Sequence, residues 1–373
     1  MSDQKVHALL TDTRMIIVCG PGGVGKTTSA AALGVLAAQT TEKRVLVLTV
    51  DPARRLATAL GLTALGNTEV PVPLPNARGS LTMAMIDTKA SWDDMIRRHA
   101  PDTNTRDKVL GNELYRTLTS RFVHSHDYVV TERLFDARES GNYDLVIVDT
   151  PPSRSALSVL DAPRRMEQFF SSRLLKLLTA PAQSRVLSMA SRPFFIVADR
   201  ILGARFLADI AEFFTLFRTM ERPVVDRARR VGALLTNTET SYLVVSSAEP
   251  VAMLEADYLV RELRRRSHHL SAVLLNRLVP LHLAVGAAQR AERLAASTDP
   301  TLRVFADAER TMAAVAQHEA AQVDVVASWG ADVLYSETRQ GDITDTDALA
   351  QLGASISARP RTYGGVGTDK NGR

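Results

Sequence analysis

Short, almost uninterrupted apolar runs recur along the chain, and they indicate buried β-strands. The runs lie at residues 14–19, 44–50, 143–149, 241–247 and 270–276. A strand that is apolar at nearly every position has both faces covered, which is typical of parallel sheets flanked by helices. The first run continues into a glycine-rich loop, an Ala-rich helical segment over 26–40 and the second run, which indicates a βαβ unit. The pattern predicts an α/β fold with a mostly parallel sheet flanked by helices.

Two long stretches, residues 89–140 and 153–232, interrupt this rhythm with helical spacing and many Leu, Phe and Met residues. We expect them to form an inserted helical subdomain. No segment repeats another, so residues 14–357 are predicted to form one domain after an extension of residues 1–13. The tail, residues 358–373, is Gly-rich, basic and poor in apolar residues, and we expect it to be disordered.

The composition narrows the classes of protein that fit. The chain of 373 residues has 45 basic and 41 acidic side chains, a balance that does not support binding to nucleic acid. No apolar run approaches the roughly 18 residues that span a bilayer, and the first residues lack the apolar core of a signal peptide. We expect a cytoplasmic protein without an integral membrane segment, with peripheral contact to a membrane left open. The single cysteine, Cys19, excludes a disulfide framework.

The stretch GPGGVGKTT, residues 20–28, has the GxxxxGK[ST] spacing of a phosphate-binding loop. Backbone N–H groups of such a loop cradle phosphates, the lysine neutralises their charge, and the hydroxyl that follows binds Mg²⁺. A glycine-rich turn without a ligand is the alternative, and the strand before the loop and the helix after it favour the phosphate site. The predicted nucleotide-binding residues are Gly22, Gly23, Val24, Gly25, Lys26, Thr27 and Thr28.

Two aspartates end predicted strands. Asp149 closes the apolar run LVIVD, the arrangement in which a carboxylate holds Mg²⁺ together with Thr27, usually through water. Asp51 follows the second run, where its carboxylate could orient an attacking water at the carboxyl edge of the sheet. The Asp-Pro pair at 51–52 also suits the start of a helix, and the residues alone leave these two roles of Asp51 open.

Three motifs together, PGGVGKTT, TVDPARRLATALG and VDTPPSRSALSVLDAP, resemble the arsenite-pump and tail-anchored-protein-targeting ATPase family of deviant Walker A proteins. The segments MIDTKASWDDMIRRHA and VVTERLFDARESGNYDLVIVDTPP are most similar to paired actinobacterial members. The resemblance covers roughly residues 14–350. It implies a P-loop NTPase fold, ATP and Mg²⁺ as ligands, and a dimer whose conformation changes with ATP binding and hydrolysis.

The resemblance also implies roles for single residues. Asp51 corresponds to the switch I aspartate that positions the attacking water, and with Lys26 it forms the predicted catalytic pair. Asn276 corresponds to the asparagine that reads the adenine edge, although an asparagine at a strand end is also a common turn residue. Residues 149–155, DTPPSRS, correspond to switch II, where Ser155 stands in place of the usual histidine.

The loop has a proline, Pro21, where the family has a lysine that reaches across the dimer to the partner's phosphates. Such a cation in trans is worth about 10³–10⁵ in rate, and proline has neither charge nor N–H. The resemblance therefore predicts a heterodimer with a lysine-bearing paralogue, or a homodimer of low activity. An arginine nearby, Arg54 or Arg154, that supplies the charge is the alternative.

Three interpretations of the client remain. Arsenite needs several soft thiolates, which one cysteine cannot provide. A targeting ATPase would bind an apolar helix, and two apolar helices, at 166–178 and 201–220, could form its groove or simply pack on each other. The second carries a stripe of Phe206, Ile210, Phe213, Phe217 and Met220, broadened by Leu202, Leu207 and Phe214. A positioning or partition ATPase is the third interpretation, but the near-neutral charge and polar tail give it little support.

Overall fold

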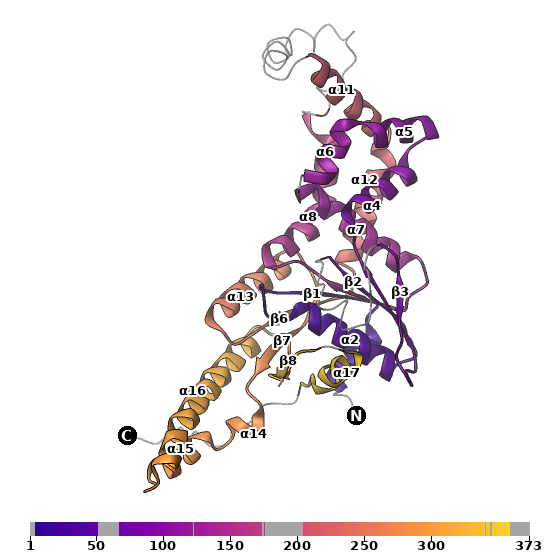
Figure 1. Cartoon of the computed structure of the whole chain (residues 1–373). Coiled ribbons are helices and arrows are strands. Elements are labelled where there is room, and N and C mark those ends of the chain that lie inside the picture. The colour runs from indigo at the N-terminus through magenta and orange to yellow at the C-terminus, as the bar shows by residue number, and fades with distance from the viewer. Residues whose placement is uncertain are drawn as a thin grey trace.

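A central sheet organises the fold in the computed structural model, which describes residues 4–50, 67–121, 123–173, 175, 204–339, 341–343 and 345–358. The eight strands have the order β3-β4-β2-β5-β1-β6-β7-β8 (Figure 1). They are β1 (Met15–Cys19), β2 (Arg44–Thr49), β3 (Val70–Val72), β4 (Ser80–Met85), β5 (Leu145–Asp149), β6 (Thr240–Ser246), β7 (Leu270–Leu278) and β8 (Asp332–Glu337). Only β3 runs antiparallel to its neighbour, which confirms the predicted mostly parallel α/β sheet.

Helices cover both faces of the sheet. One face packs against α1 (Gln4–Asp12), α2 (Lys26–Thr40) and α17 (Thr346–Ser355). The other packs mainly against α7 (Val123–Glu139), α8 (Ser153–Ser171), α12 (Glu221–Leu235), α13 (Pro250–Arg265) and α16 (Pro300–Ser328). Ile16 and Val18 of β1 point to the first face, whereas Ile17 and Cys19 point to the second. This double coverage explains why the central strands are apolar at successive positions.

A helical unit with its own core stands at one end of the molecule (Figure 1). It consists of α4 (Thr88–His99), α5 (Thr103–Gly111), α6 (Glu113–Arg121), α11 (Ala204–Arg218) and the adjoining parts of α7, α8 and α12. The latter three helices each contribute to two cores: in α7, Tyr128 packs in the helical unit and Leu134 on the sheet. The helical stretches expected over 89–140 and 153–232 coincide with these helices wherever the chain is described.

Helix α8 links the sheet to the helical unit and contains a proline. Leu157 packs on the sheet, Phe170 packs in the helical unit, and Pro163 lies between them. Because proline has no N–H, the helical hydrogen bond that it would donate to the carbonyl of Val159 is missing.

Some elements were not predicted from the apolar runs. Strands β4 (SLTMAM) and β8 (DVLYSE) contain polar residues, and β3 has only three residues, so none stands out as an apolar run. Within the expected N-terminal extension, α1 buries Val6, Leu9 and Leu10. Two further helices, α14 (Leu281–Ala284) and α15 (Ala287–Ala295), adjoin α16. Residues 359–373 of the expected disordered tail lie outside the described residues.

Candidate functional site

The loop after β1 is held by close backbone contacts that require glycine. A Cβ on Gly20 would lie 2.0 Å from the carbonyl oxygen of Val245 in the neighbouring strand β6, so no side chain fits there. Gly25 has a φ of 94° and forms the N-cap of α2, a conformation that only glycine adopts at low cost. The chain therefore turns sharply from β1 into α2, and the N-terminus of α2 lies at this loop, where a helix favours an anion.

Lys26 is the first residue of α2, and its side chain turns back over the loop. Its Nζ donates a hydrogen bond of 2.7 Å to the carbonyl oxygen of Pro21, and the lysine is buried. The ammonium group is thus held at the loop itself, where a bound phosphate would need it. Beneath the loop, burial raises the pKa of Cys19 to about 12, against a smaller opposing effect from the Lys26 charge.

Asp149 lies beside the loop at the end of the adjacent strand. In the parallel register of β1 and β5, Asp149 is paired with Val18, two residues before the loop begins at Gly20. Its carboxylate is buried, and Oδ2 accepts a hydrogen bond of 2.9 Å from Oγ1 of Thr49 at the end of β2. Thr49 was not predicted as a site residue, although its position two residues before Asp51 at a strand end was a usable signal.

The segment after Asp149 is hydrogen-bonded to β1 and to the loop. Thr150 Oγ1 donates to the carbonyl oxygen of Val18 at 2.9 Å. The N–H of Ser153, the first residue of α8, donates to the carbonyl oxygen of Gly20 at 3.1 Å. The start of α8 is therefore in direct contact with the loop. Ser155, in the place of the family's histidine, is exposed two residues further along.

Asn276 contacts the loop from the end of β7. Its Nδ2 donates a hydrogen bond of 2.8 Å to the carbonyl oxygen of Val24, and the side chain is 7 % exposed. A Cβ added to Gly25 would lie 2.4 Å from the same nitrogen. In this structure Asn276 braces the phosphate loop, a contact that the sequence did not predict, and its reading of adenine stays a prediction.

The side chains around the loop suit a Mg·nucleotide. Mg²⁺ keeps several waters and takes one or two protein oxygens with phosphate oxygens, and Thr27 and Asp149 offer a hydroxyl and a buried carboxylate next to the loop. Within the described ranges no three His, Cys, Asp or Glu side chains cluster as a protein-only metal cage. The donor set therefore fits a metal shared with phosphates.

Several predicted residues are not described by the structure. Asp51 and Arg54 lie outside the described residues, and so does the side chain of Arg154. Pro21 is buried in the loop, and its carbonyl is the acceptor for Lys26. The source of a charge in trans therefore stays a prediction.

The apolar stripe of the second helical stretch faces the core of the helical unit where it is described. Phe213 and Phe217 are both 4 % exposed and stack with ring centroids 5.6 Å apart, and Met220 is fully buried. The side chains of Phe206 and Leu207, and all of Leu202, lie outside the described residues. Each described helix is too short or too polar to cross a bilayer.

Sequence comparison finds relatives that are ATPases, which agrees with the phosphate-binding geometry of the loop. The sequence profile of the anion-transporting ATPase family matches residues 13–319. The chain is 24 % identical over 287 residues to "ATPase ASNA1 homolog" of Entamoeba histolytica, covering 74 % of this chain and 80 % of that protein. It is 25 % identical over 271 residues to "ATPase get3" of Aspergillus terreus, covering 71 % and 73 %. A homologue in Trypanosoma cruzi is 26 % identical over 284 residues, covering 71 % and 74 %.

Proposed function

The chain belongs to the anion-transporting ATPase family and is therefore an ATPase, and we propose that it couples Mg·ATP binding and hydrolysis to a conformational change of a dimer that handles an apolar client. The observation that carries this proposal is the direct connection between the phosphate loop and α8. The N–H of Ser153 binds the loop carbonyl of Gly20, and α8 continues from there into the helical unit.

At the nucleotide, Lys26 neutralises charge on the β- and γ-phosphates, and the backbone of the loop supplies N–H donors. Thr27 and Asp149 would hold Mg²⁺, which would neutralise phosphate charge. Thr49 keeps the Asp149 carboxylate in place through its 2.9 Å hydrogen bond. Asp51 orients the attacking water, in the role that the family resemblance gives it.

The partner in the proposed dimer is a lysine-bearing paralogue. Pro21 cannot place a cation on the partner's phosphates, because it has no charge and its ring is buried in its own loop. A paralogue with a lysine at this position would complete the site of this chain. The proposal predicts slow turnover by the isolated chain.

The proposed client is an apolar segment such as a membrane-protein helix. The helical unit supports this proposal through aromatic side chains that stay partly exposed among the described residues, Phe169 and Phe214 among them. An oxyanion of arsenic is a poor alternative, because the only thiol, Cys19, is buried and its pKa is raised to about 12.

Turnover measurements test the dimer and the proline together. Steady-state ATP hydrolysis is compared for the native chain, Pro21→Lys and the native chain mixed with the paralogue that co-purifies and is identified by mass spectrometry. Both the mixture and the variant should hydrolyse ATP faster than the native chain. The gain should be smaller for Pro21→Lys than for the mixture, because the introduced lysine starts from a buried position and must leave it to reach the partner's phosphates. Equal rates for native chain and mixture would mean that another residue supplies the charge.

A binding experiment tests the nucleotide site. Lys26→Ala should weaken binding of a fluorescent ATP analogue, whereas Lys89→Ala, which removes an exposed lysine paired with Asp93 in α4, should not. Hydrogen exchange with and without Mg·ATP then tests coupling. Changes in protection should extend along α8 past Pro163 into the helical unit. Changes confined to the loop and α2 would refute the proposed connection.

A further inference from the structure

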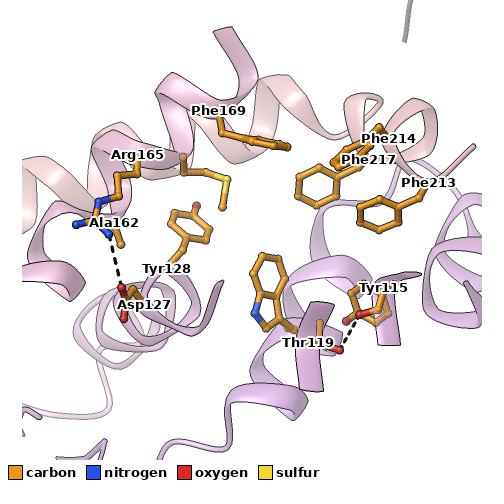
Figure 2. A pocket seen from close by; sticks show the side chains of 12 residues that line it. Tyr115, Thr119, Asp127, Tyr128, Ala162, Arg165, Phe169, Phe213, Phe214 and Phe217 are labelled. Atoms are coloured by element: carbon orange, nitrogen blue, oxygen red, sulfur yellow. Dashed lines mark hydrogen bonds and ion pairs between the residues drawn. The ribbon is translucent and has the colours of Figure 1, made fainter. Parts of the chain in front are cut away.

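An aromatic cavity lies inside the helical unit, outside the nucleotide site. Its volume is about 290 Å³, and α4, α6, α7, α8 and α11 all contribute to its walls. Figure 2 shows the rings of Tyr128, Phe169, Phe213 and Phe217 around the space, and Trp92 also lines it. Trp92, Tyr128, Phe213 and Phe217 are each less than a tenth exposed, so this part of the wall is fixed by packing. Phe169, Phe214 and Arg165, which also line the cavity, are more exposed.

The size of the cavity suits a small ligand. Pockets for small molecules are typically about 300–1,000 Å³, and the 290 Å³ here lies at the lower end of that range. A water molecule takes about 30 Å³ of liquid, and at that share the cavity admits roughly ten non-hydrogen atoms. It suits a small molecule or a single short hydrocarbon chain.

One end of the cavity is polar. Arg165 and Asp127 both line it, and their side chains form an ion pair of 3.8 Å (Figure 2). Ser158 holds both: its hydroxyl donates to Asp127 Oδ2 and accepts from Arg165 Nη1 at 2.9 Å. The Arg165 side chain is 48 % exposed, and that of Asp127 is 15 % exposed.

The arginine is better placed than the aspartate to bind the polar end of a ligand. Toward the described residues, Arg165 uses only Nη1, so Nη2 and Nε can form the two-pronged contact that guanidinium makes with carboxylate. Asp127 already accepts from Ser158 and faces Arg165. An anionic head is therefore favoured at this end, and an apolar body is favoured among the rings.

We propose that this cavity binds a small carboxylate amphiphile of about ten non-hydrogen atoms, such as a medium-chain fatty acid, with its head on Arg165 and its chain among the aromatic rings. The site goes beyond the proposed function, because it needs neither nucleotide nor a helical client. Octanoate, which has ten non-hydrogen atoms, is the matching probe.

Tryptophan fluorescence gives a direct readout in the full-length chain. The chain has two tryptophans, Trp92 at the cavity and Trp329 at the end of α16, so Trp329→Phe leaves a single reporter. Octanoate should change its emission saturably. In this background Arg165→Gln should weaken octanoate binding about tenfold, as expected for a charge-assisted hydrogen bond at a half-exposed arginine, and should leave binding of 1-octanol unchanged. Arg164→Gln removes a neighbouring exposed arginine that does not line the cavity and should change neither.

Further measurements with other ligands distinguish a contact to Arg165 from a contact to Asp127. Octylamine bound more tightly than octanoate would assign the head-group contact to Asp127 and overturn the proposal, as would equal effects of Arg165→Gln on octanoate and octanol. Absence of a saturable signal in the reporter chain would also overturn it. Lys26→Ala should bind octanoate like the parent chain, so a failure of the nucleotide proposal leaves this result unaffected.

Discussion

Asn276 offers the sharpest test of the nucleotide site, because its contact in the structure differs from the role that the family resemblance implies. Its Nδ2 donates to the carbonyl oxygen of Val24 at 2.8 Å, and the contact is buried. In Asn276→Ala this carbonyl loses its partner, which costs about 1–3 kcal/mol for a buried group. We expect the variant to lower the free energy of unfolding by about 2 kcal/mol.

Asn276→Ala should weaken nucleotide binding by the same free energy, because binding of the phosphates must then restore the loop conformation that Asn276 no longer holds. About 2 kcal/mol corresponds to a rise of roughly 30-fold in Kd. A brace on the loop backbone acts equally on every nucleotide, since all share the phosphates. The Kd values of ATP and GTP should therefore rise by the same factor. A reader of the adenine edge would instead lose discrimination between the two bases.

The assay combines denaturant unfolding with competition of ATP and GTP against a fluorescent nucleotide. Asn142→Ala, in the exposed turn before β5, is the matched control and should change neither quantity. Unchanged stability together with a loss of ATP preference over GTP in Asn276→Ala would refute the bracing role. It would favour the adenine contact instead.

Four further expectations concern the loop and other sites. Gly25→Ala should reduce ATP affinity at least about 30-fold in calorimetry, since the φ of Gly25 is 94° and a Cβ would lie 2.4 Å from Asn276 Nδ2. Adding Asn276→Ala to this variant should restore only part of the lost ATP affinity. Full restoration would show that backbone strain at residue 25 is unimportant. Asp51→Asn should keep the ATP Kd and lower kcat, and a parallel loss of both would favour a helix-capping role. Phe217→Ala should cost about 3–5 kcal/mol in denaturant unfolding, because the ring is buried and stacked on Phe213; a fully stable variant would place Phe217 in an open groove. Cys19, whose pKa is raised to about 12 by burial, should resist iodoacetamide at pH 8 until the chain unfolds, and alkylation of the native chain detected by mass spectrometry would contradict this burial.

The central strands and the phosphate loop could be predicted from sequence because each has a strong local signal. β1 and β5 are apolar at nearly every position, and β2 and β6 have the continuous apolar centres VLVL and YLVV. The glycines and Lys26 have a spacing that few other structures require. Strand β8 lies at the edge of the sheet, where one neighbouring strand is lost, and β4 lies next to the short edge strand β3. Both carry polar residues that interrupt the apolar pattern.

Contacts that join distant segments could not be predicted in this way. The hydrogen bond from Thr49 to Asp149 spans 100 residues, and that from Asn276 to Val24 spans 252. They exist only because the strand order places β2, β5, β1, β6 and β7 side by side. The stripe with Phe213 and Phe217 was visible as a helical face, but its spacing alone could not show whether that face meets a client or the other helices.

The proline in α8 affects how a rotation at the phosphate loop can reach the helical unit at the other end of the molecule. With no hydrogen bond across Pro163 to Val159, the 19-residue helix resists bending less there than elsewhere. The segment from Pro163 to Ser171 is roughly 12 Å long at about 1.5 Å per residue, so a change of about 10° at the proline displaces its far end by roughly 2 Å. Such a displacement exceeds half a carbon–carbon contact distance. A small rotation at the phosphate loop can therefore be converted, at low elastic cost, into a rearrangement of the aromatic packing around Phe170.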